Sequence, residues 1–561
     1  MPRPVRWTML AAAMLTCAAF GAPPRVNYVM TPLFEDGALT SVQIDLTFRG
    51  AHGGETPLEL PNEWGGQREL WRGVSELQVV SGATMSDGAD AWHRLLHHRP
   101  DAASHVRYRV IQDRSGDPAG EQGNAYRPVI RPTYFHLIGN AFIIQPGVDD
   151  NSPTRVSVHG LPRNWSFASD LEHPGLTLSH ARQSVAVAGD FRIVRGADPR
   201  IRVAMRGQWS FTDAEFAERV NTIISGERSF WGDGSTPYLV TLVQLMSPNP
   251  NWLSIGGTGL EDSFAFFATP NADLRQMTRT LAHEGIHTWI PIQVGGMPDH
   301  DEAADYWFSE GFTDFYTGRL LVRDGVWTPA EYAADFNETL SAYAQSPMRT
   351  QPNARIVADF WNDQDVGKLP YQRGRMLAAI WDARLRARGH SLDEVMHRMR
   401  ERARQAGHAN ATRLFSELMN GMGVDVRSDV ATYVELGAPI AMPQDVFAPC
   451  GDIVTRQTPV FSRGFDIDAT IANHNVISGV DPTLPAYAAG LRDGMVLIRR
   501  DHGAIGDSEH EIAYVVRDGG AERTIAYMPH GRASYTQQRL VLDDPLAGEQ
   551  LARCRALLAG E

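Results

Sequence analysis

The sequence predicts a multidomain α+β protein with strands on both flanks and a mainly helical middle. At 561 residues the chain is too long for one hydrophobic core and should divide into several domains. Residues 25–200 contain alternating apolar runs broken by Gly, Pro and Asp, which is typical of strands joined by turns. Residues 326–440 show helical spacing instead, and short strands and turns return after Pro449.

Composition narrows the class of protein. Hydrophobic residues make up 43% of the chain and charged residues 21%, which describes a folded globular protein rather than a disordered one. The formal net charge is −14, so the surface is acidic. Because phosphates repel such a surface, nucleic acid and anionic membranes are not expected as main partners.

The N-terminus has the features of an export signal over residues 1–22. Arg3 and Arg6 precede an apolar stretch from Trp7 to Phe20, which is too short to span a bilayer. The residues before Cys17 match a lipoprotein signal poorly, so no lipid anchor is expected there. No later segment is long and apolar enough to span a membrane. We therefore expect an exported protein, periplasmic or secreted.

Residues 23–204 are predicted to form an N-terminal β-sandwich. Alternating runs such as 42–48 and 106–110 place every second side chain on one face, as antiparallel strands of a sandwich require. After this domain we expect a helix near 212–228, a strand over 238–245 and a loop over 249–259.

The middle of the chain is predicted to contain a series of helices. The first begins at Thr269, where Thr-Pro can start a helix, and carries Leu274, Met277 and Leu281 at helical spacing. The following helices run from about Asp301 to Asp324, from Pro370 to near Gly389, and onward from a capping box at residues 391–394.

Residues 281–290, LAHEGIHTWI, carry the first candidates for chemistry. His283 and His287 are four residues apart, so on a helix both imidazoles can bind one metal ion. Glu284 stands beside the first histidine and would reach a metal-bound water as general base. Two histidines leave a tetrahedral zinc site incomplete, so a third ligand has to come from elsewhere.

The segment WFSEGFTDFY supplies Glu310 as the third ligand, from the next predicted helix. Asp299, Asp301 and Glu302 are alternatives, although they lie in or beside a loop where a solvated acidic turn is the simpler interpretation. Asp314 follows Glu310 by one helical turn and could orient a metal-binding histidine. A surface or capping role is the alternative for Asp314.

Together, HEGIHTW and WFSEGFTDFY resemble the gluzincin metallopeptidases, most closely the glycyl aminopeptidase family, which is related to the aminopeptidase N family. The resemblance implies that His283, His287 and Glu310 bind one Zn²⁺ per chain. It also implies a thermolysin-like catalytic domain over residues 205–325 and a helical domain over residues 326–445.

Two further segments resemble motifs of this family. The segment GLED is similar to G-G-L-E-H, whose glutamate holds the α-amine of the substrate, which implies a substrate-binding role for Glu261 and the neighbouring Gly259. The segment PYQRG is similar to Y-x-K-G, whose tyrosine hydrogen-bonds the developing oxyanion, which implies a catalytic role for Tyr371. The sequence departs from the family where it has Asp262 in place of a histidine, and Gly285 and Ile286 in place of two aromatic residues.

Residues 446–561 resemble a PDZ domain through the segments SRGFD and LPAYAAGLRDGMVLI. The resemblance implies a C-terminal peptide as ligand, which would add a strand to a sheet edge. A domain that only packs on the catalytic core and binds nothing is the alternative.

Cys450 and Cys554 are the two cysteines that remain after removal of the export signal. In an oxidising compartment an even pair predicts one disulfide. Two unrelated buried thiols are the alternative.

These features predict an exported zinc aminopeptidase that acts on peptides with a free N-terminus, with a preference for Gly or Ala by family resemblance. Two other functions stay open: a catalytically silent PDZ-type peptide-binding protein, and a zinc endopeptidase on the same fold. The complete set of ligands and the general base favour an enzyme, and Glu261 favours an aminopeptidase.

Overall fold

The computed structural model describes residues 26–561, except 121–123, 173–174, 235, 248–251, 299 and 407–409. The predicted export signal, Cys17 and Asp299 therefore lie outside the described residues. The chain divides into two compact units. Unit 1 is Met1–Ala217 with Ser235–Asp273, and unit 2 is Glu218–Gly234 with Leu274–Glu561. Within the described part of the chain, no helix is both long enough and apolar enough to cross a membrane.

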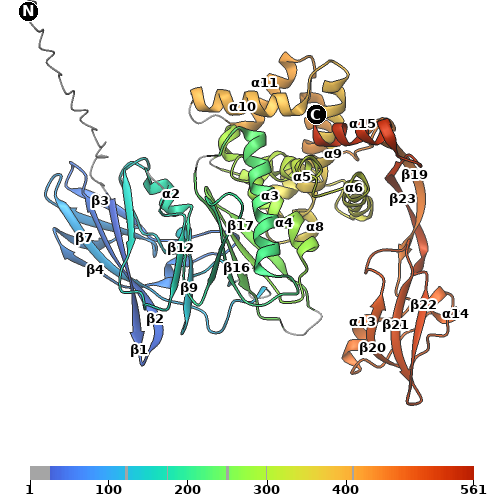
Figure 1. The fold of residues 1–561 in the computed structure, drawn as a ribbon, viewed down its shortest axis with the longest axis horizontal. Helices are drawn as coiled ribbons and strands as arrows, with labels where there is room; N and C mark the ends of the chain where they lie inside the picture. Colours follow the sequence, from blue (N-terminus) through green and yellow to red (C-terminus); the bar gives the residue numbers. More distant parts are fainter. Residues whose placement is uncertain are drawn as a thin grey trace, which may run out of the picture. The chain divides into compact units, whose positions relative to one another are not determined.

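Unit 1 begins with two sheets that contribute to one hydrophobic core (Figure 1). In order, the first consists of β11 (Thr154–Val158), β1 (Val26–Glu35), β2 (Ala38–Arg49), β7 (Ala103–Val110) and β4 (Val74–Ser81), and the second of β10 (Gln145–Pro146), β3 (Glu55–Glu59), β6 (His93–His98) and β5 (Ala83–Asp87). The predicted strands 42–48 and 106–110 lie in β2 and β7, which are antiparallel neighbours. In β2, Val42, Ile44 and Leu46 are fully buried and the residues between them are less so, which confirms the predicted alternation.

The remaining strands of unit 1 form two further sheets around a second core. One has the order β12 (Ser166–Ser169), β13 (Val185–Gly189), β9 (Tyr134–Ile138), β8 (Val129–Arg131), and the other the order β14 (Arg192–Arg195), β15 (Ile201–Arg206), β16 (Tyr238–Gln244), β18 (Ser263–Ala268), β17 (Ile255–Gly259). β15, β16 and β18 run parallel, whereas the edge strand β17 is antiparallel to β18.

The predicted loop over 249–259 is wrong for residues 255–259, which form β17. The glycine-rich sequence IGGTG has no apolar alternation, and pairing comes from the backbone of β18. A Cβ atom at Gly257 would lie 2.4 Å from the ring of Phe264, so the strand needs glycine at that position.

Unit 2 is mainly helical, with one large hydrophobic core. Its principal helices are α4 (Leu274–Ile286), α5 (Tyr306–Arg323), α6 (Pro329–Gln345), α9 (Leu369–Arg386), α10 (Leu392–Ala406) and α11 (Ala411–Gly421). The predicted helix start at Thr269 is wrong, because Thr269 is hydrogen-bonded to the backbone of Ser254 and α4 begins later. The predicted helix from Asp301 divides into a 3-10 turn, Glu302–Asp305 (η4), and α5, and Asp301 itself has a φ of 55°. The helices predicted after Pro370 and after residue 391 are present as α9 and α10.

The C-terminal part of unit 2 is a two-stranded ribbon that carries a small lobe (Figure 1). The ribbon consists of β19 (Gly451–Phe461) and β23 (His530–Leu542), and the lobe of α13 (Ile467–Ala472), α14 (Pro485–Ala488), β20 (Val496–His502), β21 (Ile512–Asp518) and β22 (Ala521–Tyr527), with a core of its own. After β23 the chain forms α15 (Gly548–Ala559), which packs against the helices. A disulfide with an S–S distance of 2.09 Å joins Cys450 to Cys554 in the helical core.

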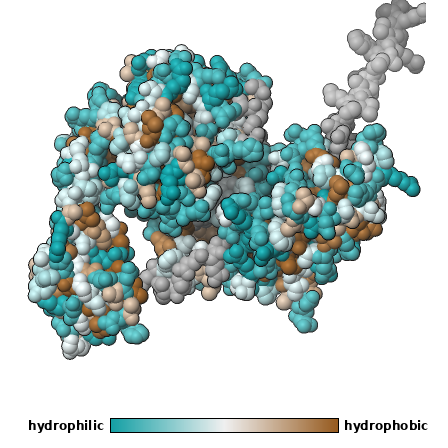
Figure 2. Space-filling view, turned by 180° about the vertical axis from the view of Figure 1, so that it is seen from behind, coloured by the Kyte–Doolittle hydropathy of each residue, from teal (hydrophilic) through white to brown (hydrophobic). Residues whose placement is uncertain are grey.

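Directly after Gly464 and Phe465 the lobe forms helix α13 rather than a strand. A peptide that adds a strand to this sheet would have to pair with β20 or β22, which are its edge strands. Figure 2 shows a surface on which hydrophobic residues are scattered among polar ones. A PDZ-like fold and a peptide ligand for this lobe stay predictions.

Candidate active site

Three side chains from neighbouring helices meet at one point of unit 2. His283 lies in the last turn of α4, His287 directly after α4 ends, and Glu310 in α5. The Nε2 atoms of His283 and His287 are 3.2 Å apart, and Glu310 Oε2 is 3.3 Å from the first and 3.5 Å from the second. Among the described residues, these three form the one group of His, Cys, Asp and Glu side chains that is arranged to hold a metal ion.

The size and chemistry of this triangle fit zinc. Ligand atoms about 2.0–2.1 Å from a tetrahedral ion lie about 3.3–3.4 Å from one another. The three separations between the ligand atoms here are 3.2, 3.3 and 3.5 Å. Two imidazole nitrogens and a carboxylate oxygen are also a donor set that zinc prefers. The alternative ligands Asp301 and Glu302 are not part of the group.

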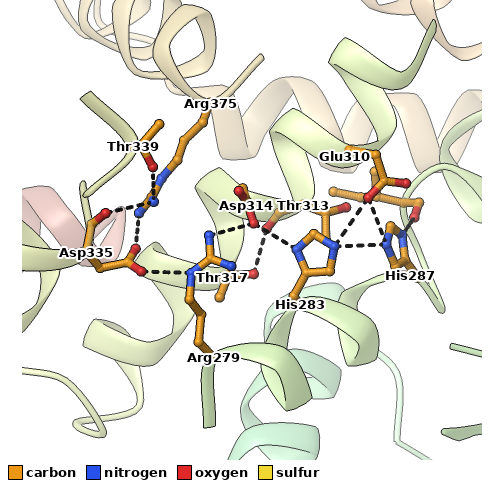
Figure 3. A network of polar contacts seen from close by, with 11 residues as sticks. Arg279, His283, His287, Glu310, Thr313, Asp314, Thr317, Asp335, Thr339 and Arg375 are labelled. Carbon is orange, nitrogen blue, oxygen red and sulfur yellow. Dashed lines mark hydrogen bonds and ion pairs between the residues drawn. The ribbon is translucent and has the colours of Figure 1, made fainter. Parts of the chain in front are cut away.

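Hydrogen bonds orient both imidazoles with Nε2 toward the triangle (Figure 3). His283 Nδ1 donates to Asp314 Oδ1 over 2.9 Å, and His287 Nδ1 donates to the carbonyl of Ile290 over 2.9 Å. Because a carbonyl only accepts, the Nδ1 of His287 carries a proton and its Nε2 is free to bind a metal. Asp314 therefore lies where it can orient His283 toward a metal.

The charges around the triangle attract a cation. Burial opposes a charge on His283, but the carboxylates of Asp314 and Glu310 outweigh burial and raise the pKa of the imidazole to about 10. Burial would raise the pKa of Glu310, yet the two histidines hold that pKa well below its usual range. Two carboxylates around two imidazoles therefore favour a positive charge here, whether a proton or a divalent metal ion.

Helix α9 crosses α5 at a pair of glycines beside the triangle. A Cβ atom on Gly374 would lie 1.8 Å from the carbonyl oxygen of Trp307, and one on Gly311 would lie 2.3 Å from the Cα of Gly374. Gly311 directly follows Glu310, and Gly374 lies three residues after Tyr371. The crossing therefore brings the first turn of α9 against the part of α5 that carries the ligand.

Tyr371 lies next to the triangle as a result of this crossing. Its ring stacks on the ring of His283 with a centroid distance of 5.9 Å and an interplanar angle of 25°. Burial and then the carboxylates of Glu310 and Glu284 raise the pKa of the phenol. The hydroxyl therefore stays protonated at neutral pH and can donate a hydrogen bond.

Gly285, which stands where the resembling family has an aromatic residue, lies against a side chain of another helix. A Cβ atom there would lie 2.4 Å from Oε2 of Glu227, which belongs to α3 (Asp213–Trp231). Glu227 is 1% exposed, and neither carboxyl oxygen has a hydrogen-bond partner among the residues that the structure describes. Burial and the nearby Asp324 raise the pKa of Glu227. The small residue in HEGIH therefore makes room for a buried carboxyl group.

Glu261 and Gly259 belong to unit 1, at the junction of β17 and β18. Glu261 Oε1 is 2.7 Å from Nε2 of His180, and the Glu261 side chain is 35% exposed. The Nδ1 atom of His180 is in turn 2.7 Å from the hydroxyl of Thr177. The hydrogen bond to Glu261 raises the pKa of His180. Glu261 is thus an accessible carboxylate with a histidine as its partner.

The residues that surround the ligands are not among those that the sequence predicts. Arg279 contacts Asp314. It lies four residues before His283, so the side chains of Arg279 and His283 share one face of α4. Gly311 and Gly374 stand inside helices, where glycine is unfavourable without a packing reason. The spacing of Arg279 from His283 and the two glycines inside helices could therefore have indicated these residues. No sequence pattern indicates the buried Glu227.

Comparison with known proteins places this site in context. Residues 276–366 match the family model of the M61 glycyl aminopeptidases, and this segment includes all three candidate ligands and Glu284. A search of curated proteins finds no significant match.

Solved structures resemble the chain at low sequence identity. An aminopeptidase N family protein from Idiomarina loihiensis is 15% identical with a TM-score of 0.65, over 95% of this chain and 100% of that chain. An M1 zinc metallopeptidase from Deinococcus radiodurans is 16% identical with a TM-score of 0.44, over 74% of this chain and 95% of that chain. The first similarity shows a shared fold. The family match and the geometry of the triangle show a zinc aminopeptidase-type hydrolase.

Proposed function

We propose that the protein is an exported zinc aminopeptidase that removes small N-terminal residues from peptides with a free N-terminus. The observation that carries this proposal is the triangle formed by His283 Nε2, His287 Nε2 and Glu310 Oε2 inside the matched segment. These three side chains would hold one Zn²⁺. The preference for small residues such as Gly and Ala rests on family resemblance, and export rests on the N-terminal sequence.

Each proposed catalytic residue has one task. When bound, zinc supplies a Lewis acid that polarises the scissile carbonyl and acidifies a water molecule. The carboxylate of Glu284 accepts the proton of the attacking water and returns it to the leaving amine. The hydroxyl of Tyr371, whose pKa is raised by burial and then by the neighbouring carboxylates, donates a hydrogen bond to the oxygen that becomes negatively charged.

Glu261, with Gly259 beside it, is the proposed anchor for the α-amine of the substrate. The GLED motif and the accessible carboxylate support this role. A substrate ammonium would either share the carboxylate of Glu261 with His180 or take the place of His180 as its partner. An endopeptidase needs no such anchor, so the role of Glu261 distinguishes the proposed aminopeptidase from the alternative, a zinc endopeptidase. The complete ligand set makes a catalytically silent peptide-binding protein the weaker alternative.

The variant Glu284→Gln tests the proposed mechanism. Glutamine keeps the size of the side chain but cannot accept the proton, so kcat should fall by about 10²–10⁴-fold. Zinc content, measured by elemental analysis, should stay at the wild-type level because the ligands are unchanged. The control Glu417→Gln makes the same chemical change on the surface of α11 and should leave kcat as it is. A zinc-loaded Glu284→Gln protein that cleaves aminoacyl substrates at the wild-type rate would refute the mechanism.

A further inference from the structure

We propose that Arg279 is a positioning residue of the metal site, which orients His283 through Asp314 and thereby raises the affinity for zinc. The inference rests on the proposed metal site but not on peptidase activity. Arg279 and His283 are one helical turn apart on α4, so their side chains leave the same face of the helix. Figure 3 shows both side chains directed at Asp314 of α5.

One carboxylate oxygen joins the arginine to the histidine. Asp314 Oδ1 accepts from His283 Nδ1 over 2.9 Å and from Arg279 Nη2 over 2.8 Å. The Asp314 side chain is 7% exposed and that of Arg279 is 35% exposed, so water reaches the guanidinium but hardly the carboxylate oxygen that joins the two residues. With Arg279 in place, the carboxylate has a fixed direction and so does the imidazole that donates to it.

The other side of Arg279 is fixed as well. Its Nε donates to Asp335 Oδ1 of α6 over 2.7 Å. Asp335 also binds Arg375 of α9, and Arg375 Nη1 donates to Thr339 over 2.8 Å. A continuous series of polar contacts therefore runs from His283 through Asp314, Arg279 and Asp335 to Arg375 and ties four helices together (Figure 3).

The desolvation cost of this network argues that it sets the orientation of side chains rather than adding stability. Buried ion pairs are an inefficient source of stability, because desolvation offsets most of the attraction and apolar side chains of the same size often stabilise as well. A network of this kind does specify orientation, since carboxylates and guanidinium groups form strong hydrogen bonds only within a narrow range of relative orientations. This network ends on the Nδ1 atom of a metal ligand, so the orientation that it specifies is that of His283.

Zinc affinity of the full chain is the direct test, by competition with a chromophoric chelator at fixed pH. Arg279→Met keeps the length of the side chain without its charge, and we expect its zinc dissociation constant to rise about tenfold, at the lower end of the 10–100-fold cost of altering a ligand's partner. Asp314→Asn should cost as much or more. Because Arg279 acts through Asp314, the double variant should bind zinc no more weakly than Asp314→Asn. Arg279→Lys should recover part of the affinity.

Arg275 provides a matched control. It lies one turn before Arg279 on α4, its side chain is 82% exposed, and it pairs with Glu331 at 3.1 Å. Arg275→Met removes the same charge from the same helix without touching Asp314, so its zinc affinity should equal that of the wild type.

Two outcomes would overturn the inference: wild-type zinc affinity in Arg279→Met, or losses that multiply in the double variant. Should Arg279→Met fail to fold, Asp335→Ala carries the test, because alanine offers no side-chain acceptor and so frees Arg279 from α6 while the arginine stays. That variant should bind zinc several-fold more weakly, and unchanged affinity would contradict the positioning role. The variant His283→Ala separates the two proposals: if it binds zinc like the wild type, the metal site itself is wrong.

Discussion

Glu310 and Glu261 are the two carboxylates that motifs predict for zinc and for the substrate amine, and their surroundings differ strongly. Glu310 is 16% exposed on a helix, within 3.5 Å of two histidines. Glu261 is 35% exposed after an edge strand, with His180 as its partner at 2.7 Å. Helix crossings and buried charges thus determine the position of the first, whereas a single histidine accompanies the second.

The difference shows how the two tasks divide between rigid and adaptable parts. Metal binding depends on separations of a few tenths of an ångström, so the ligands sit on a helix or directly after one, and both histidines are held by partners of their own. Substrate recognition tolerates more freedom, and the segment that we propose to bind the substrate amine can change without loss of the metal. Substitutions near Glu310 should therefore have larger effects than substitutions near Glu261.

Of the substitutions that test this comparison, Gly374→Ala should have the largest effect, because it breaks the helix crossing beside Glu310. The new Cβ would meet the carbonyl oxygen of Trp307, so α5 and α9 must move apart and Tyr371 must leave its place. Overpacking of this kind costs about 1–3 kcal/mol of stability or more. A displacement of about 1 Å at a catalytic group costs about 10²-fold in kcat. Denaturant unfolding and kcat of the folded protein measure the two effects.

Gly421 is the control for this prediction, since it ends α11 and has no atom within 4 Å of an added Cβ. Gly421→Ala should be neutral or stabilising by up to about 1 kcal/mol. Wild-type kcat and stability in Gly374→Ala would mean that the close crossing does not hold Tyr371.

The same contrast explains how much the sequence could predict. His283 and His287 follow from helical spacing over one turn, and Glu310 follows from a second local motif on the next long helix. Arg279 and Asp335 are 56 residues apart, and no local pattern marks two side chains that meet only after α4 and α6 pack together. The strand β17 was missed because glycines carry no apolar pattern, and the partner of Glu261 because His180 lies on a separate short helix, α2 (Leu178–Arg182).

A smaller effect is expected from Glu261→Ala. Loss of a charged hydrogen bond to the substrate ammonium costs about 1.5–2 kcal/mol, or about 10–30-fold in kcat/KM for aminoacyl substrates with a free amine. N-acetylated substrates cannot form this contact, so any residual cleavage of them should not change. Zinc content should not change either, because Glu261 takes no part in the triangle. Equal losses on free and acetylated substrates would remove the argument for an aminopeptidase.

The smallest effect concerns the pH dependence of substrate binding and comes from His180→Gln. The hydrogen bond to Glu261 raises the pKa of His180, with further contributions from Asp262 and Asp170. Below that pKa a charged imidazole competes with the substrate ammonium for Glu261, and above it the competition weakens. The wild-type KM should therefore fall by about two- to fourfold as the pH rises from about 6 to 8, an effect of the size of an exposed ion pair. Glutamine carries no charge at any pH, so the variant should show a flatter profile, whereas His390→Gln, which removes a histidine paired with Glu394 at 2.9 Å, should keep the wild-type profile. If His180→Gln retained the full pH dependence of KM, His180 would not compete with the substrate for the carboxylate of Glu261, and this prediction would be wrong.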